Sequence, residues 1–382
     1  MWDELNLRHL RAVAAIVRLG SISAATRAVS ISQPAITQGL SKLEGQLGIA
    51  LFNRQPEGMQ PSEAAMLLAP RIERALHHVG SPRVTTAQMR ALLALAEAGS
   101  YVSASVATGL SQPTLHRALA DLSIALRRKL VERRGKGIGF TDSGQSTIRA
   151  FRLARAELAA GLAEIDLLKG REVGRIAIGA MPLPRARLLP AALVAFHALY
   201  PDFRVVIAEG SFAELIEPLR DGDLDLMLGA LRLPPPGDDV QQLPLFLDRP
   251  VIIGRKDHPL ANRQPSLAEL ASFPWIVSPQ GTPLHGQWRA MFDAARIPLP
   301  KVPIECGSVL AIRQMLIASD FLTMLSADQV ALELSVNWLV RIADAPAGLT
   351  RNIGMTTRTG WRPTPLQAAF LDQVRIASSK ME

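Results

Sequence analysis

The chain has 382 residues, which is too long for one compact core and predicts two or three domains. Hydrophobic residues make up 48% of it and charged residues 20%, a balance typical of folded proteins and unlike that of disordered ones. No apolar run reaches the roughly 18–20 residues needed to cross a bilayer, and the single cysteine, Cys306, excludes an internal disulfide. The chain does not begin with a basic segment followed by an apolar one, so we expect no secretory signal and a cytoplasmic location.

The net charge of +8 is unevenly distributed along the chain. All of the excess positive charge lies in the first 170 residues, whereas residues 171–382 contain equal numbers of basic and acidic side chains. This pattern is typical of a polyanion-binding module joined to a domain with another role. A basic face that only confers solubility is the alternative that charge alone leaves open.

The first 145 residues contain an internal repeat. A shift of 79 residues places Ser32-Gln33-Pro34 on Ser111-Gln112-Pro113 without a gap, and Gly20-Ser21 on Gly99-Ser100. The same shift aligns the leucines that follow in both segments. We therefore interpret the two segments as copies of one small module.

The first copy predicts three helices and a hairpin. Apolar spacing predicts a helix that stops at Gly20, and Ser21 or Ser23 can cap the short helix that follows. Ser32 is the expected cap of the third helix, with Pro34 in its first turn, where a missing amide hydrogen costs nothing. A two-stranded wing is expected from Leu51-Phe52 across Pro56-Glu57-Gly58.

The third helix has one apolar and one polar face. Its buried stripe is predicted to be Ile36, Leu40, Leu43 and Leu47. The opposite face contains short hydrogen-bonding side chains and few acids, which suits base edges and phosphates in a major groove. These outward residues are Gln33, Thr37, Gln38, Ser41 and Lys42.

Taken together, these segments resemble the N-terminal domain of LysR-type transcriptional regulators. The likeness rests on Leu7-Arg8-His9-Leu10, on residues 20–25, on residues 32–37 and on Leu51-Phe52-Asn53-Arg54. It implies a winged helix-turn-helix whose third helix reads the major groove while the wing touches the backbone. Gln38 and Gly39 stand where the family usually has Arg and Gln, so no base preference is transferred. The DNA-binding residues expected in this copy are Ser32, Gln33, Pro34, Thr37, Gln38, Lys42 and Arg54.

The second copy is more basic but less regular. Arg117 restores the arginine of the family pattern, whereas Thr108, Ser123 and Val131 depart from it. We expect the first copy to be the main base reader, and the second to be another reader, a phosphate clamp or a dimerisation element. Its expected DNA-binding residues are Ser111, Gln112, Pro113, His116, Arg117, Arg133 and Arg134.

A long helix is predicted from Asp142 to about Lys169, since this stretch has no proline and keeps apolar residues at helical spacing up to Gly170. About 28 residues would form a helix roughly 40 Å long. Long apolar helices rarely stand alone, and similar helices in LysR-type proteins dimerise the DNA-binding domains. The favoured partner is therefore a second subunit, in a homodimer or homotetramer, and packing against the same chain is the alternative.

The C-terminal half alternates strand-like and helix-like segments, and this βαβ order predicts a parallel sheet covered by helices. Residues 251–254 are expected to cross into a second lobe, and residues 351–357 to return to the first before a final helix after Pro363. The first-lobe strands are expected at 175–179, 203–207 and 224–228, and second-lobe strands at 275–277, 302–305 and 321–325.

This half resembles the effector domain of LysR-type regulators, which has the two-lobed fold of periplasmic solute-binding proteins. The likeness rests on Leu199-Tyr200-Pro201-Asp202, on residues 219–226 and on Asp257-His258-Pro259-Leu260. The fold class is thus multidomain, with two helical winged modules, a linker helix and an α/β two-lobed domain. The expected boundaries are 1–80, 81–141, 142–170 and 171–382, with lobe I at about 171–250 and 347–382 and lobe II at about 251–346.

A small-molecule effector is expected in the cleft between the lobes, at strand ends and helix N-termini, where free amides favour anions. An ordinary helix cap or turn is the alternative for each candidate, Ser308 included. The candidate effector-binding residues are Met181, Pro182, Ser278, Gly281, Thr282 and Ser308.

Catalytic motifs are not found in the sequence, and we expect no enzyme, cofactor or metal site. His77 and His78 are adjacent and point apart on a helix, and Gly135-Lys136-Gly137 reads as a wing turn because no helix-forming run follows it. The sequence thus predicts a transcription regulator whose partners are double-stranded DNA, a small effector and a second copy of itself, joined through the linker helix and the effector domain, without a membrane. The alternative is an architectural DNA-binding protein whose C-terminal domain only serves oligomerisation.

Overall fold

The computed structural model describes residues 2–55, 58–134 and 137–381. The chain divides into two compact units. The first comprises Met1–Gly174 with Asp221–Asp223 and Pro363–Leu366, and the second comprises Arg175–Arg220, Leu224–Arg362 and Gln367–Glu382.

The first copy of the repeat forms the winged helix-turn-helix that its sequence predicts. Asn6 caps the first helix by accepting from Arg8 N at 2.8 Å, and Gly20 ends it with φ 73°. Ser21 caps the second helix by accepting from Ala24 N at 3.1 Å. Its elements are η1 (Trp2–Glu4), α1 (Leu7–Leu19), α2 (Ile22–Val29), α3 (Gln33–Leu47), β1 (Phe52–Gln55), β2 (Gly58–Pro61) and α4 (Glu63–Val79).

The second copy repeats this order, which confirms the internal repeat. Thr85 and Gln88 form a capping box at its first helix, and Ser100 caps the second by accepting from Ser103 N at 3.1 Å. Thr141 caps the last helix through Gly144 N. The elements are α5 (Thr86–Ala98), α6 (Tyr101–Thr108), α7 (Gln112–Leu126), β3 (Val131–Arg134), β4 (Gly137–Phe140) and α8 (Asp142–Leu168).

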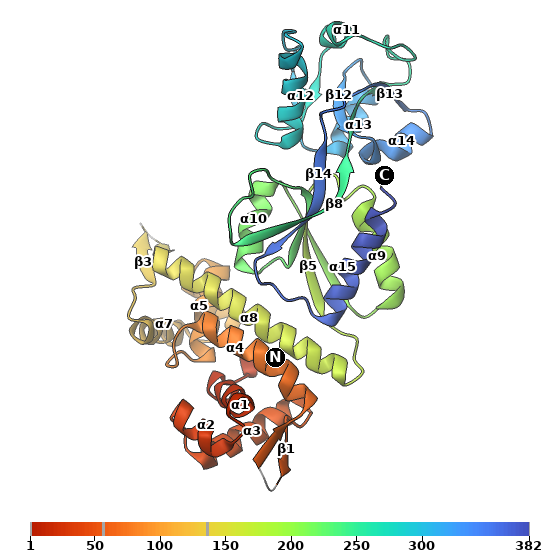
Figure 1. Cartoon of the computed structure of the whole chain (residues 1–382). Coiled ribbons are helices and arrows are strands. Elements are labelled where there is room, and N and C mark those ends of the chain that lie inside the picture. Colours follow the sequence, from red (N-terminus) through yellow and green to blue (C-terminus); the bar gives the residue numbers. More distant parts are fainter. Residues whose placement is uncertain (1, 56–57, 135–136, 382) are drawn as a thin grey trace. The chain divides into compact units, whose positions relative to one another are not determined.

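Helices α4 and α8 lie side by side (Figure 1). Along α4, Arg71 pairs with Glu164, whereas Arg74, one turn later, pairs with Glu157, so the two helices are antiparallel. One continuous hydrophobic core runs through both copies and includes both helices. Its members at this helix pair include Leu68, Ile72, Phe151, Leu158, Leu162 and Ile165.

The apolar face of α8 is therefore covered inside the chain. The sequence favoured a second subunit as the partner of this helix, but the structure shows α4 of the same chain in that place. The reason lies in the repeat, because α4 is the counterpart of α8 in the first copy and has a matching buried stripe that contains Ala65, Leu68 and Ile72.

The second unit begins with a five-stranded sheet in the order β6-β5-β7-β14-β8. Strands β5, β6 and β7 are parallel, as predicted, but β14 is antiparallel to both β7 and β8, so the sheet is mixed. Helices α9 and α15 lie together, and the rings of Phe196 and Phe370 are in edge-to-face contact, with 5.4 Å between their centroids. The elements of this lobe are β5 (Arg175–Ala180), α9 (Leu188–Leu199), β6 (Arg204–Glu209), α10 (Phe212–Asp221), β7 (Leu226–Ala230), β8 (Val240–Asp248), β14 (Arg351–Arg358) and α15 (Pro365–Ser378).

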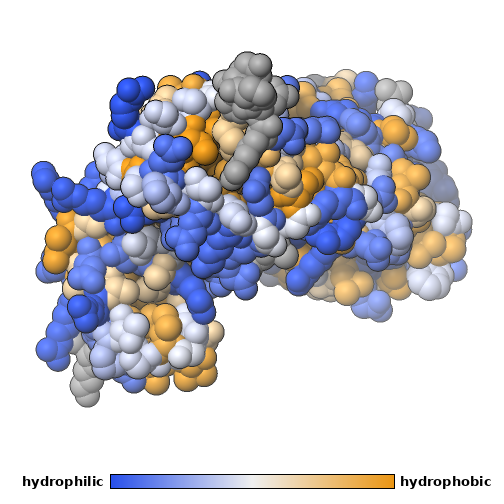
Figure 2. All heavy atoms as spheres, turned by 90° about the horizontal axis from the view of Figure 1, so that it is seen from below, coloured by the Kyte–Doolittle hydropathy of each residue, from blue (hydrophilic) through white to orange (hydrophobic). Residues whose placement is uncertain are grey.

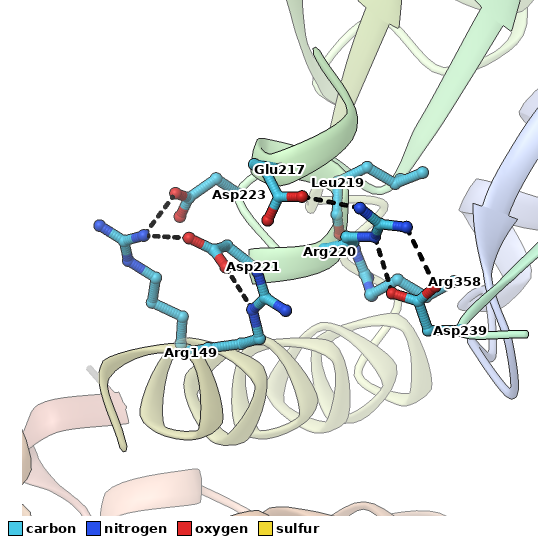
Figure 3. A network of polar contacts seen from close by, with 9 residues as sticks. Arg149, Glu217, Leu219, Arg220, Asp221, Asp223, Asp239 and Arg358 are labelled. Atoms are coloured by element: carbon cyan, nitrogen blue, oxygen red, sulfur yellow. Dashed lines mark hydrogen bonds and ion pairs between the residues drawn. The ribbon is translucent and has the colours of Figure 1, made fainter. Parts of the chain in front are cut away.

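Arginines fix the C-terminal end of α10 (Figure 3). Arg220 donates to Glu217 and Asp239, each at 2.7 Å. The buried Arg358 donates to the backbone oxygen of Leu219 at 2.7 Å. Since the last carbonyls of a helix have no partner within the helix, Arg358 satisfies one of them, while Arg220 anchors α10 to Asp239 in the loop before β8.

The second lobe surrounds an antiparallel sheet, β12-β9-β13, and a parallel pair, β10-β11. Its core contains Trp275, Trp288 and Phe292 in mutual ring contact. The elements are β9 (Pro250–Arg255), α11 (Leu267–Ala271), β10 (Ile276–Val277), α12 (Pro283–Ala294), β11 (Ile304–Glu305), α13 (Val309–Ile317), β12 (Thr323–Ser326), η2 (Ala327–Val330), α14 (Ala331–Ser335) and β13 (Leu339–Asp344).

No helix within residues 2–55, 58–134 and 137–381 is both long and apolar enough to span a membrane. Hydrophilic and hydrophobic residues are intermingled on the face that Figure 2 shows.

Candidate nucleic-acid interface and effector site

Helix α3 packs against the core on one side and is exposed on the opposite side. Its buried side is anchored by Ile36 and Leu43, which are 1% and 0% exposed. The opposite side borders an open hollow, and the hollow is lined by the same side chains that the sequence placed outward, together with Pro34. These lining residues are Gln33, Pro34, Thr37, Gln38, Ser41 and Lys42.

The N-terminus of α3 differs from the sequence prediction in one respect. Ser32 occupies the N-cap position, as predicted, and is exposed, but among the described residues its side chain makes no cap hydrogen bond. Pro34 already fixes the backbone of the first turn, which lets the helix begin without this bond. Within the turn, Thr37 Oγ1 donates to the Gln33 carbonyl at 3.1 Å.

Gly39 admits the ring of His9, a residue that the sequence analysis missed. A Cβ atom on Gly39 would lie only 2.6 Å from His9 Cδ2, so α1 and α3 approach closely here. Burial lowers the pKa of His9, and the positive charges of Lys42 and Arg8 lower it further. A glycine in the middle of an otherwise regular helix was the signal in the sequence.

Helix α7 presents the second candidate surface. Leu115, Leu119 and Leu122 are buried, and Ser111 caps the helix by accepting from Thr114 N at 3.3 Å. His116 stacks on Tyr101 with 3.6 Å between ring centroids, and burial raises the pKa of that tyrosine.

The outward positions of α3 and α7 differ in chemistry at equivalent places. Exposed residues on α7 include Gln112, Pro113, His116, Arg117 and Asp121. Under the shift of 79 residues, Thr37 corresponds to His116, Gln38 to Arg117, and Lys42 to Asp121. An acid on α7 therefore replaces the lysine of α3.

The wings position the remaining basic candidates. Arg54 lies in β1, and Arg133 and Arg134 lie in β3, with Arg133 exposed. The predicted turn residues Pro56-Glu57 and Gly135-Lys136 lie outside the described residues.

Four effector candidates gather at one edge of the second lobe. Strands β10 and β11 are parallel, and the loops that follow them meet, since a Cβ on Gly307 would lie 3.5 Å from Pro279 Cγ. The N-termini of α12 and α13 begin at these loops. The edge thus contains Ser278, Gly281, Thr282 and Ser308.

Two hydroxyl groups at this edge serve as helix caps. Thr282 Oγ1 accepts from His285 N at 3.3 Å, and Ser308 Oγ accepts from Ala311 N at 3.4 Å. The carbonyl of Ser278 contacts His285 Nδ1 at 2.8 Å. Gly281 has φ +77° and is exposed, so its amide lies in a turn that favours glycine.

Met181 follows β5 and is largely buried. It is 7% exposed, and a Cβ on Gly229 would lie 2.0 Å from its Cε atom. Its side chain therefore fills the core beside β7, whereas Pro182 is partly exposed. The apolar character of Met181 is explained by this packing.

Other polar residues of this unit escaped the sequence analysis. The Arg187 guanidinium of lobe I pairs with Asp328 of lobe II, and Gln287 Nε2 donates to the Thr350 carbonyl at 2.6 Å. Within the described residues, the buried indole nitrogen of Trp288 has no hydrogen-bond partner. The described part of the chain also contains no cluster of three His, Cys, Asp or Glu side chains that could hold a metal ion.

Comparisons with known proteins identify both halves. The bacterial regulatory helix-turn-helix model of the lysR family matches twice, at residues 7–66 and 86–145, and the LysR substrate binding domain matches residues 169–378. The chain is 30% identical over 383 residues to the HTH-type transcriptional regulator GalR of Pseudomonas putida, covering 97% of this chain and 96% of that one.

Two solved structures share the fold. Full-length CbnR in complex with its target DNA is 20% identical, with a TM-score of 0.55 over 76% of this chain and 98% of that chain. LysG from Corynebacterium glutamicum, with bound effector Arg, is 18% identical, with a TM-score of 0.54 over 77% and 97%. Because both domain models match and a relative aligns along nearly the entire length, the chain belongs to the LysR family of transcriptional regulators.

Proposed function

We propose that this chain regulates transcription by reading operator DNA with α3, under the control of a small molecule bound in its second unit. The observation that carries the proposal is the polar, exposed face of α3, which lines an open hollow while the opposite face is fixed in the core. Membership of the LysR family supports it, because that family consists of DNA-binding regulators. The chain would act in the cytoplasm and by binding rather than catalysis.

Each side chain of α3 has a distinct role in this proposal. Gln33 and Gln38 are suited to paired hydrogen bonds with adenine, and Lys42 to a phosphate. The hydroxyl of Ser32 is not used as a cap and can contact the backbone beside Pro34. Thr37 would contact a base or its methyl group. On the wing, Arg54 would bind a phosphate.

The second module is proposed to contact DNA as well. Arg117 on α7 is exposed and suited to a two-pronged contact with guanine. Gln112 and His116 share that face, while Ser111 and Pro113 set the start of the helix. Arg133 and Arg134 on β3 would bind phosphates.

The effector is proposed to bind at the edge formed by the β10 and β11 loops. Two helix N-termini begin there, and their free amides favour an anionic group such as a carboxylate. Ser278, Gly281, Thr282 and Ser308 would supply polar contacts, with Pro182 on the facing lobe. Met181, which packs on Gly229, would add an apolar contact. A second copy of the chain is proposed to associate through the effector domain.

Footprinting of bound genomic fragments tests the DNA-binding part. We expect a sequence-specific site, and Gln38→Ala should weaken its binding by about 1–3 kcal/mol if the side chain reads a base. Gln46→Ala, on the same helix but near its C-terminal end, is the matched control and should leave affinity unchanged. The absence of any specific site would overturn this part.

A thermal-shift screen of the full chain against small acids and sugars tests the effector part. A ligand at 100 times its Kd should stabilise the unit that binds it by about 2.7 kcal/mol. The same ligand should change operator affinity, which distinguishes a regulator from an architectural DNA-binding protein. If no compound does both, ligand control is rejected while DNA binding stands.

A further inference from the structure

We infer that one chain carries both recognition helices for a two-part operator, α3 and α7, which we call its two reading heads. We also infer that the two half-sites of this operator differ in sequence. The inference rests on the proposed DNA-binding function and specifies which DNA the chain recognises and how many chains one element requires.

The two modules are arranged as a pair. Equivalent helices α4 and α8 pack in antiparallel orientation, and both modules share one continuous core. Antiparallel pairing of equivalent elements relates the two copies as a twofold axis relates two subunits. Paired helix-turn-helix modules of this kind read two half-sites along the DNA. The chain therefore contains internally what a symmetric regulator obtains by dimerising.

The charge pattern at the α4–α8 contact selects this pairing. Arg71 bonds to Glu157 at 3.1 Å and to Glu164 at 2.5 Å, and all three side chains are nearly buried. The position of α8 that corresponds to Arg71 is Ala150. Two copies of α8 would therefore bury the glutamates without this arginine.

Two copies of α4 would be mismatched in the converse way. The positions of the first copy that correspond to Glu157 and Glu164 are His78 and Thr85, so Arg71 would have no acid at either place. A buried charge without its partner is costly, and such mismatches discriminate between pairings. Pairing of α4 with α8 is therefore favoured over either pairing of like helices.

Further contacts join the modules away from this cluster. Thr86 Oγ1 donates to the Leu5 carbonyl at 2.6 Å, and Arg11 Nη1 donates to the Pro82 carbonyl at 3.1 Å. At the far end of α8, Lys169 Nζ donates to the Leu47 carbonyl at 2.6 Å, where α3 ends. These bonds connect the start of the first module and the end of its helix α3 to the second module of the same chain.

The two recognition helices, α3 and α7, favour different base sequences. Gln38 on α3 suits adenine, whereas Arg117 at the equivalent position of α7 suits guanine. Lys42 attracts a phosphate, whereas Asp121 at the equivalent position repels a phosphate and can accept a hydrogen bond from the amino group of cytosine. The two reading heads cannot prefer the same half-site, so the operator is not a palindrome.

A set of altered operators tests this inference with the full chain. The half-site protected by α3 is called A and the one protected by α7 is called B. We expect the chain to bind the symmetric A–A element at least about 10-fold more weakly than A–B, because the loss of one base contact lowers the affinity by about this factor. Equal or tighter binding of A–A would overturn the inference, because two first modules from two chains would then read the operator.

A mixing experiment tests whether both heads belong to one chain. Gln38→Ala and Arg117→Ala chains are each expected to bind A–B about 10–100-fold more weakly than the natural chain. A mixture of the two should remain weak, because no single chain has both heads intact. Recovery of natural affinity in the mixture would show reading in trans and overturn the inference. If no element is bound specifically by the natural chain, the proposed function itself fails, which is a distinct result.

Discussion

The guanidinium of Arg71 on α4 lies 2.5 Å from the carboxylate of Glu164 on α8, and both side chains are less than one-tenth exposed. Burial acts to lower the pKa of Arg71, but hydrogen bonds and charge from Glu164 and Glu157 outweigh it and raise that pKa. The pair joins two helices that are equivalent in the repeat but differ in charge.

Replacing Arg71 with Met should destabilise the first unit by about 3–5 kcal/mol, because two glutamates would stay buried without their partner. Urea unfolding of the full chain, followed on this unit, measures the effect. Arg155→Ala is the control within the same unit, since Arg155 and Glu97 form a partly exposed pair worth at most about 1 kcal/mol. Equal effects of the two substitutions would show that the buried cluster contributes nothing special.

Alanine should be unfavourable for stability at position 144 of the second module but favourable at the equivalent position 65 of the first. A Cβ on Gly144 would lie 2.1 Å from the Leu130 carbonyl oxygen, so Gly144→Ala should cost about 1–3 kcal/mol and loosen the second wing. The first copy already contains Ala65 at this place, fully buried, and Ala65→Gly should cost about 1 kcal/mol from helix propensity.

Thermal unfolding and hydrogen exchange at the wings measure both changes. If Gly144→Ala left the second wing protected, the backbone would have moved to accept the methyl group.

Gly161 lets α8 pack closely against α4. A Cβ there would lie 2.8 Å from Leu68 Cδ1 and 3.2 Å from Arg71 Cβ, so Gly161→Leu should destabilise the pair by about 1–3 kcal/mol. Gly286 on α12 has open space around it, and Gly286→Ala should stabilise by roughly 0.5–1 kcal/mol. Opposite signs in the unfolding free energy are the expected result, and a stabilising Gly161→Leu would contradict it.

Local pattern predicted much of the DNA-binding unit. The repeat, the helix limits and the outward face of α3 followed from apolar spacing and turn residues, which act over a few residues. The partner of α8 did not follow, because an apolar stripe specifies burial but not which surface covers it. The deciding feature was Arg71, whose acids lie 86 and 93 residues further along the chain.

The second unit was predicted less completely for the same reason. Its parallel strands are short and apolar. In β8 and β13, however, buried and exposed positions do not alternate regularly, so their sequences do not identify them as strands. Met181 was predicted as a candidate because it follows a strand, but its packing against Gly229, from a strand distant in sequence, could not be predicted from local pattern. The Arg187–Asp328 pair between the lobes likewise joins residues that no local motif connects.

His258 should make the second lobe less stable in mild acid. Burial lowers the pKa of this histidine, and its Nδ1 accepts from Leu260 N at 3.1 Å, which requires the neutral ring. The unfolded chain therefore takes up the proton first as pH falls, so stability is lost from about pH 7 through the ordinary value of 6.5 and down to the folded pKa.

Melting temperatures of the full chain between pH 7.5 and 5 measure this loss. His258→Asn keeps an acceptor for Leu260 N and should flatten the pH dependence, whereas His197→Asn, at an exposed position, should not. An unchanged slope in His258→Asn would assign the acid sensitivity to other groups.

The salt dependence of operator binding should distinguish Lys42 from Asp121. Each phosphate contact releases counterions, so Lys42→Ala should weaken binding and reduce the slope of log K against log salt by about 1. Asp121→Asn removes a negative charge from the exposed face of α7 and should strengthen binding, most clearly at low salt. Titration of operator DNA at several salt concentrations measures both effects. If Asp121→Asn instead weakened binding equally at all salt concentrations, Asp121 would be accepting a hydrogen bond from a base, and α7 would read sequence through its acid.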